Sequence, residues 1–391
     1  MNDAVLPAHS ALGASAASRW LNCPGSVKLS QSVPPAPTSI YAATGTLAHM
    51  FIERGLKPPI KRMEHGQIGL GYTIEGHDIT VDEDLVDGVN VMLDYVKQRR
   101  VDFDELHTEM TVHLDGYFTP PPPVRMFGRT DVVLISRREV EIVDYKNGSG
   151  VIVEPENNPQ TLYYAAGVIA WLRRRVPPYL PAKVKTTIVQ PHARSVAKVR
   201  SATLDVVDLM MWVDEVLVPG VAACSVPDAP LVPGSWCRFC PVSSSCPALI
   251  SEANRMAKLE FNDEGLKLDD PTEMSRLLDV ATRARAWCDA LEAVALDQLK
   301  RQVRIPGWTL APTRPTRKWS DERAAGDQLH ALGVVDAWRT DLKTPAQIEK
   351  LVRKQLSNRA WDEQLSPLVE SVSSGVKLAR DDAAPFEDFT C

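Results

Sequence analysis

Two carboxylates and a lysine lie close together where apolar and polar residues alternate most strongly. Asp131 ends the motif Gly128-Arg-Thr-Asp131, and Asp144 begins the motif Asp-Tyr-Lys146. Carboxylates on adjacent strands can bind one divalent cation, because Mg²⁺ and Mn²⁺ prefer oxygen ligands. Lys146 should point to the same side of its strand as Asp144, where it could hold or deprotonate a water molecule or neutralise charge on a phosphate. Taken alone, so short a pattern more often marks solvated acids at strand ends.

Two pairs of residues at helical spacing add polar side chains to these motifs. Gln160 and Tyr164 are four residues apart and therefore share one face of a helix, where they could orient water and contact DNA. His49 and Glu53 have the same spacing on an earlier helix, and His49 is a candidate metal ligand. Each pair considered alone is more often ordinary helix polarity.

Cysteines form a third pattern. Three of the seven fall within ten residues, as Cys237-Arg-Phe-Cys240 followed by Cys246. The spacing Cys-x₂-Cys-x₅-Cys is typical of thiolates that bind zinc or an iron–sulfur cluster, and three thiolates are one short of a complete four-cysteine site. The cysteines interpreted as ordinary thiols, because they lack ligand spacing, are Cys224, Cys288 and Cys391.

Periodicity predicts the elements that position these residues. Apolar residues at helical spacing predict helices over residues 39–56, 82–100, 159–175 and 203–218. Alternation predicts strands over residues 107–115, 127–135, 139–146 and 183–191. The order helix, three strands, helix, strand indicates a mixed α/β unit in which antiparallel hairpins feed a crossover helix. Asp131 and Asp144 would then lie on adjacent strands.

After residue 250 the sequence pattern predicts mainly helices. A long helix is predicted over residues 271–302, a β-hairpin over residues 307–319, and shorter helices near 321–332 and 344–356. We therefore expect two domains: residues 1–250 with the candidate site, and residues 251–391 as a mainly α-helical C-terminal region.

Composition limits the classes of protein. The chain has 391 residues, of which 44% are hydrophobic and 24% charged, so it is neither disordered nor a fibrous rod. The formal net charge of −6 argues against a nonspecific coat on nucleic acid, but it allows a nuclease with a local basic groove. Basic residues that could follow a phosphate backbone, or simply form a solvated face, are Arg173 to Arg175, Lys183, Lys185, Arg194, Lys198 and Arg200. No leader and no apolar run of about 20 residues is evident, so we expect a cytoplasmic protein without membrane contact.

The motifs together resemble the PD-(D/E)XK nuclease superfamily, in its RecB-type exonuclease branch, over roughly residues 10–250. That resemblance implies an α/β fold with a restriction-endonuclease-like core, in which a mixed sheet is flanked by helices. It implies that the histidine and both acids bind Mg²⁺ or Mn²⁺, that the lysine serves the attacking water, and that the glutamine and tyrosine complete the site. By matching motifs, these roles fall on His49, Asp131, Asp144, Lys146, Gln160 and Tyr164. The chain departs from the pattern in having Thr130 before Asp131 and aspartate rather than glutamate at position 144.

A subset of that branch carries a [4Fe–4S] cluster bound by one cysteine before the nuclease core and three after it. The resemblance therefore implies a cluster on Cys23, Cys237, Cys240 and Cys246, with zinc as the alternative metal. Such a cluster would hold the N-terminus against the segment that follows the core. The stretches Trp20-Leu-Asn-Cys23-Pro24 and Asn158-Pro-Gln160 further resemble a family encoded by phages and prophages.

These observations predict a metal-dependent DNA nuclease, and more narrowly an exonuclease of phage DNA processing or recombination in the bacterial host cytoplasm. The partners implied are DNA and a phage recombination or single-strand-annealing protein, and self-association stays open. Two alternatives belong to other classes: a non-catalytic DNA-binding or scaffold protein on a nuclease fold, and a redox-sensing iron–sulfur protein. Filled catalytic positions argue against the first, and the second leaves the Asp-x-Lys and Gln-x-x-x-Tyr motifs unexplained.

Overall fold

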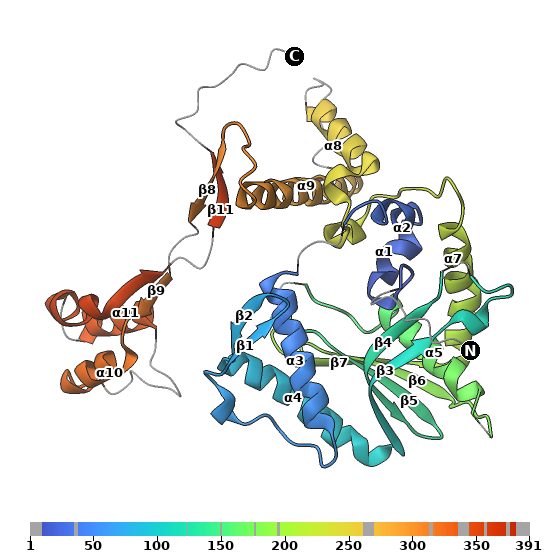
Figure 1. The fold of residues 1–391 in the computed structure, drawn as a ribbon, viewed down its shortest axis with the longest axis horizontal. Helices are drawn as coiled ribbons and strands as arrows, with labels where there is room; N and C mark the ends of the chain where they lie inside the picture. Colours follow the sequence, from blue (N-terminus) through green and yellow to red (C-terminus); the bar gives the residue numbers. More distant parts are fainter. Residues whose placement is uncertain are drawn as a thin grey trace. The chain divides into compact units, whose positions relative to one another are not determined.

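A computed structural model gives the fold (Figure 1). It describes residues 10–34, 38–122, 124–148, 151–175, 177–193, 196–260, 270–312, 316–334, 344–355, 358–372 and 376–380. The chain forms two compact units, Met1–Trp287 and Cys288–Cys391. Within the described part, no helix combines the length and the apolarity that crossing a membrane requires.

Helices and one small hairpin precede the main sheet. They are α1 (Ala17–Asn22), α2 (Gly25–Ser30), α3 (Ile40–Leu56), β1 (Gly71–Ile74), β2 (His77–Thr80) and α4 (Glu83–Arg99). The start of α3 is fixed by Ser39, whose side chain accepts a hydrogen bond from the backbone N–H of Ala42, and Asp82 caps α4 in the same way. The helices predicted over residues 39–56 and 82–100 are therefore confirmed, and α3 carries His49.

Five of the described strands form the central sheet. They are β3 (Glu105–His113), β4 (Phe127–Ile135), β5 (Glu139–Tyr145), β6 (Lys183–Val189) and β7 (Val199–Asp205), and they lie side by side in that order. β5 and β6 are parallel and are connected through α5 (Pro159–Arg173), whereas the other neighbours are antiparallel. This is the predicted mixed sheet with a crossover helix, in an α/β unit. The candidate acids lie on the adjacent strands β4 and β5.

The edge strand β7 was absent from the sequence prediction, which placed a helix over residues 203–218. The chain instead stays extended to Asp205, and α6 (Val206–Trp212) begins at the next residue. A short π-helical segment (Val213–Leu217) joins α6 to α7 (Val218–Cys224). Extended pairing with β6 overrides helix propensity at residues 203–205, since every residue of β7 has a partner across the ladder.

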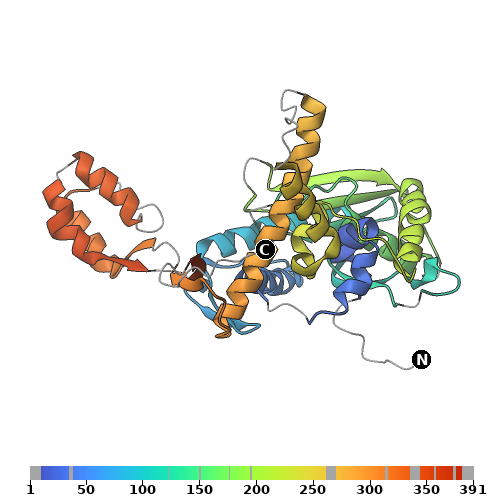
Figure 2. The ribbon, with the colours of Figure 1, turned by 90° about the horizontal axis from the view of Figure 1, so that it is seen from above.

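Apolar residues on the two faces of the sheet build two cores. Val133 and Ile135 of β4 pack in a cluster with residues of α1 and α5, while Val132 and Leu134 pack with residues of α3 and α4. Figures 1 and 2 show α3 and α4 on one side of the sheet and α1, α5 and α7 on the other. The sheet therefore holds His49 on one side and Gln160 on the other.

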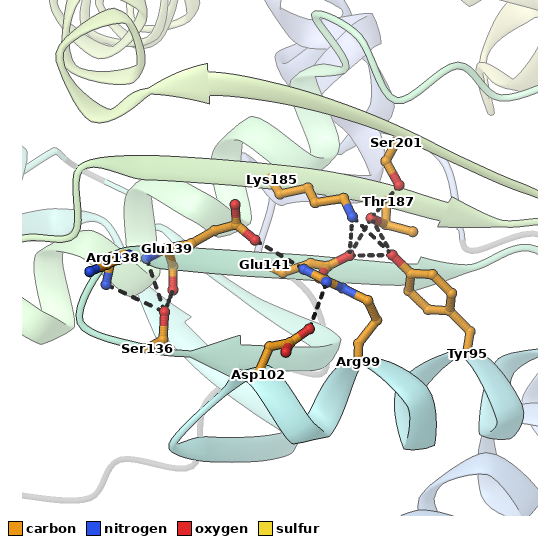
Figure 3. Close-up of polar contacts among 10 residues, drawn as sticks. All are labelled: Tyr95, Arg99, Asp102, Ser136, Arg138, Glu139, Glu141, Lys185, Thr187 and Ser201. Carbon is orange, nitrogen blue, oxygen red and sulfur yellow. Dashed lines mark hydrogen bonds and ion pairs between the residues drawn. The ribbon is translucent and has the colours of Figure 1, made fainter.

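A buried ion network attaches α4 to the sheet (Figure 3). Glu141 of β5 is fully buried, and its carboxylate accepts hydrogen bonds from Tyr95 and Arg99 of α4 and from Thr187 of β6. Lys185 Nζ lies 3.5 Å from Glu141 Oε1. Because every charge here has partners, the network fixes β5 and β6 against α4 rather than leaving a reactive group.

After the sheet in sequence come α8 (Pro247–Glu260) and α9 (Pro271–Lys300). α9 confirms the long helix predicted over residues 271–302. The second unit contains β8 (Trp308–Pro312), β9 (Thr316–Trp319), α10 (Glu322–Ala331), α11 (Pro345–Gln355), α12 (Asn358–Ala360), β10 (Val369–Val372) and β11 (Val376–Arg380). It has its own apolar core around Trp319 and Trp361.

The hairpin predicted over residues 307–319 is corrected by the strand pairing. Both strands form, but β8 pairs with β11 and β9 pairs with β10, so two antiparallel pairs join this segment to the end of the chain. Local alternation identifies a strand without identifying its partner, and here the paired residues are 50 to 56 positions apart in sequence for β9 with β10 and 64 to 72 for β8 with β11.

Candidate active site

Three potential metal ligands meet where α3 approaches the sheet. His49 Nδ1 lies 3.5 Å from Asp131 Oδ1, and one ligand atom each from His49, Glu109 and Asp131 all lie within 4.8 Å of one another. The other oxygen of Asp131 is fixed by the backbone N–H of Tyr145 on β5, at 2.7 Å. A histidine nitrogen and carboxylate oxygens at this spacing suit a divalent cation such as Mg²⁺ or Mn²⁺.

Glu109 is a site residue that the sequence prediction missed. In the register of β3 with β4, Thr108 pairs with Val132 and Met110 pairs with Thr130. Glu109 lies between these two pairs and therefore opposite Asp131. Its φ of 50° lies in the left-handed region that glutamate rarely adopts. Strain of this kind often accompanies a functional role. The only signal in the sequence is a single carboxylate within an alternating strand, which is common on ordinary solvated strands.

Asp144, Lys146, Gln160 and Tyr164 form one connected polar chain. Lys146 Nζ lies 2.8 Å from Asp144 Oδ2 and donates to Gln160 Oε1 at 2.9 Å. Gln160 Nε2 in turn faces Asp144 Oδ1 at 3.2 Å and the Tyr164 hydroxyl at 3.3 Å. The cap of α5 aims Gln160, because Asn158 Oδ1 accepts from the backbone N–H groups of residues 160 and 161. The structure therefore brings together these four predicted residues, from β5, the residue that follows it, and α5.

Burial sets the electrostatics of the site. Burial and the neighbouring Asp144 raise the pKa of Asp131 above its usual range, and burial together with Asp131 does the same to the pKa of Glu109. Burial lowers the pKa of His49, which favours the neutral imidazole that can ligate a metal. For Lys146, burial acts to lower the pKa, but Asp144 outweighs it and the pKa is raised. Lys146 is therefore an ammonium group.

A loop between β5 and α5 joins Lys146 to Gln160, and a buried glutamine holds it. Gln190 Nε2 donates to the backbone carbonyls of Gly148 and Val151, at 2.8 Å and 2.7 Å. Its Oε1 accepts from Arg200 Nη2 at 2.8 Å. Sequence reasoning did not single out Gln190, because a lone glutamine after a strand carries no pattern.

The four candidate cluster cysteines line one pocket, although Cys23 is far from the others in sequence. Cys23, Cys237, Cys240 and Cys246 line it with Arg19 and Ser26. Among the described residues, no three of the four sulfurs lie within 4.8 Å of one another. The pocket closes because the N-terminal segment packs on the segment after the core, where the backbone N–H of Gly25 donates to the carbonyl of Pro230 at 3.0 Å.

Polar groups in this pocket point at the sulfurs. The backbone N–H of Val232 lies 3.2 Å from Cys23 Sγ, and that of Gly234 lies 3.4 Å from Cys237 Sγ. A third backbone N–H, from Val242, is directed at Cys240 and opposes the rise in the pKa of that thiol caused by burial. Ser26 Oγ is buried and has no hydrogen-bond partner among the described residues. These donors suit thiolate sulfurs, which are better acceptors than thiols.

The basic residues that sequence analysis grouped do not form one open track. Lys185 belongs to the buried Glu141 network, Arg175 pairs with Glu105, and Arg200 binds the carbonyl of Val153 and the side chain of Gln190. Arg194 lies outside the described residues, as does Cys391, one of the three cysteines interpreted as ordinary thiols. Lys185, Arg175 and Arg200 are therefore engaged in contacts within the protein rather than free to follow a phosphate backbone.

Comparison with known proteins identifies a family, and a weak structural likeness is also found. The structure titled "Crystal structure of SSO0001" matches with 14% sequence identity and a TM-score of 0.22, over 43% of this chain and 72% of that one. The model of a phage-associated family, described as "Protein of unknown function (DUF2800)", matches residues 9–385. Because this match spans nearly the whole sequence, the chain belongs to the DUF2800 family.

Proposed function

We propose that this protein is a divalent-metal-dependent DNA nuclease of phage DNA processing or recombination, with a PD-(D/E)XK active site. The observation that carries the proposal is the connected chain of Asp144, Lys146, Gln160 and Tyr164 beside Asp131 and His49. These residues were selected as nuclease motifs from sequence alone, yet they come from α3, β4, β5 and α5. Their convergence is not expected of unrelated solvated side chains.

His49, Glu109 and Asp131 would hold Mg²⁺ or Mn²⁺, with Asp144 at the margin of the site. The residues fit such an ion, since burial and a neighbouring carboxylate raise the pKa of both Asp131 and Glu109, and such carboxylates become stably ionised when a cation joins them. When bound, the ion would supply Lewis acidity for water attack on a phosphodiester.

Lys146 would act by its charge. As an ammonium group held by Asp144 and Gln160, it can orient the attacking water and stabilise negative charge that develops on the phosphate. Gln160 and Tyr164 fix the lysine and the Asp144 carboxylate in place, which is positioning rather than bond chemistry. Each polar contact among Asp144, Lys146, Gln160 and Tyr164 would thus have a role in hydrolysis.

We further propose a [4Fe–4S] cluster on Cys23, Cys237, Cys240 and Cys246. Shared lining of one pocket, three backbone N–H groups aimed at sulfurs, and the unpartnered Ser26 hydroxyl support a bound group with anionic sulfur. Zinc is the alternative, but a tetrahedral zinc site holds its sulfurs about 3.8 Å apart. The pocket would have to contract for zinc, because each set of three sulfurs includes a separation above 4.8 Å.

End-labelled linear DNA and closed circular DNA, incubated with Mg²⁺ or Mn²⁺, test the nuclease proposal. We expect loss of label from the linear DNA and little cleavage of the circle, as an exonuclease requires. The matched variants are Lys146→Ala, which should be inactive, and Lys183→Ala, which alters an exposed lysine of β6 and should be active. A wild-type protein that binds DNA but cleaves neither substrate with either metal would favour the scaffold alternative.

A further inference from the structure

We propose that Arg129 binds a phosphate of the DNA backbone, and that the divalent cation controls this contact by competing with Arg129 for Glu109. The inference rests on the proposed nuclease function and names a contact with substrate that no motif assigned. Arg129 lies two residues before Asp131 on β4, in the stretch that carries the Gly128-Arg-Thr-Asp131 motif.

Arg129 contacts the candidate metal site through Glu109 and is itself largely exposed. Its Nε lies 2.8 Å from Glu109 Oε2, and Glu109 is the residue whose carboxylate groups with His49 and Asp131. The Arg129 side chain is 61% exposed, whereas that of Glu109 is 18% exposed. The guanidinium therefore spans from the enclosed carboxylate to solvent, where a DNA strand could approach.

Charge makes the two partners of Glu109 competitors. A carboxylate that ligates a divalent cation has less negative charge left for a guanidinium, and the cation also repels that guanidinium. The guanidinium of Arg129 would then bind a phosphate of a DNA strand at the site, because its planar array of N–H donors matches two phosphate oxygens. In the metal-free protein the same arginine is held by Glu109 and binds phosphate less well.

This arrangement couples the two ligands. If metal releases Arg129 to phosphate, metal strengthens DNA binding and DNA strengthens metal binding by the same factor. Direct contact between metal and phosphate would also couple them, so the share due to Arg129 is the part of the coupling that disappears in an Arg129 variant.

Binding rather than cleavage tests the proposal. Fluorescence anisotropy of a labelled DNA oligonucleotide is measured with Mg²⁺ or with EDTA, in a Lys146→Ala background that should not cut the probe. We expect Arg129→Ala to weaken DNA binding about tenfold with Mg²⁺ and much less with EDTA. The slope of log affinity against log salt should fall by about 1, as for one lost phosphate contact. Arg138→Ala is the control, because this exposed arginine lies in the turn that joins β4 to β5 (Figure 3).

Calorimetric Mn²⁺ titration without DNA distinguishes phosphate binding from a structural role. Loss of a competitor for Glu109 should leave Mn²⁺ affinity unchanged or tighter in Arg129→Ala. Weaker Mn²⁺ binding would show that Arg129 only positions Glu109, and unchanged DNA affinity and salt slope would equally overturn the proposal. If the background protein binds no DNA under any condition, the nuclease proposal itself fails and this inference fails with it.

Discussion

Gly128 of β4 lies directly against the ring of Tyr164, so closely that a Cβ on the glycine would come within 2.9 Å of Tyr164 Cε1. Tyr164 is in turn hydrogen-bonded to Gln160, which holds Lys146. We therefore predict that Gly128→Ala displaces Tyr164, lowers kcat, and costs about 1–3 kcal/mol of stability through overpacking. Cleavage rates and urea unfolding curves measure the two effects.

Gly66→Ala is the matched control for this variant. Nothing lies within 4 Å of a Cβ built on Gly66, and its φ is not in the left-handed region, so the added methyl group should be tolerated. Equal loss of activity in both variants would mean that contact with Tyr164 is not what requires glycine at position 128.

Lys146→Ala should lower the rate of DNA cleavage by at least about a hundredfold, because it removes a preorganised charge from the site of phosphate chemistry. The protein should still fold and bind DNA, since the polar contacts of the lysine side chain among the described residues are with Asp144 and Gln160 and not with the apolar core. Circular dichroism and DNA binding by anisotropy check both points. Full cleavage by this variant would reject the assignment of Lys146.

Metal dependence gives a separate test. Asp131→Ala and Asp144→Ala should each abolish Mg²⁺- or Mn²⁺-dependent cleavage, and EDTA should do the same to the wild-type protein. Glu109→Gln should weaken Mn²⁺ binding by roughly tenfold or more, as expected when a carboxylate near a metal is lost. Activity that persists in EDTA would refute metal catalysis, and unchanged Mn²⁺ affinity in Glu109→Gln would remove that residue from the site.

The order of the elements around the site could be predicted from periodicity. The strand over 127–135 matches β4, and the helix over 159–175 matches α5 closely. These segments are buried over most of their length, so their apolar residues report the structure directly. The edge strand β7 could not be predicted in this way, because half-exposed residues at a sheet edge have a weak pattern.

The site was predictable only where a motif lies in a short stretch of sequence. Asp144 is on β5 and Lys146 directly follows that strand, still in extended backbone, so their proximity follows from strand geometry. Glu109 joins Asp131 through the register of β3 with β4 and through an unusual backbone angle, and neither is written in local sequence. The same reason explains the error at β8 and β9, where alternation gave the strands but not their partners.

The buried network in Figure 3 predicts a large effect on stability from a residue far from the motifs. Arg99→Ala removes the guanidinium that binds Glu141 at 2.8 Å, which leaves a buried carboxylate with weaker compensation. We expect a loss of about 3 kcal/mol in the free energy of unfolding, measured by urea denaturation. Asp102→Ala removes an exposed partner of the same arginine and should cost no more than about 1 kcal/mol. Equal costs would show that burial of Glu141 does not govern this network.

The pocket lined by the four cysteines leads us to expect bound iron and a metal-mediated link between Cys23 and the distant Cys237, Cys240 and Cys246. Because Cys23 shares the pocket with Cys237, Cys240 and Cys246, a cluster there would close a loop of more than two hundred residues and stabilise the folded chain. Anaerobically purified protein should be brown, with about four irons per chain. Cys23→Ser should lose iron and unfold at lower temperature, as should Cys240→Ser, whereas the exposed Cys288 should tolerate serine. Stoichiometric zinc in place of iron would disprove the cluster but keep the constraint, and full metal content in Cys23→Ser would disprove the constraint itself.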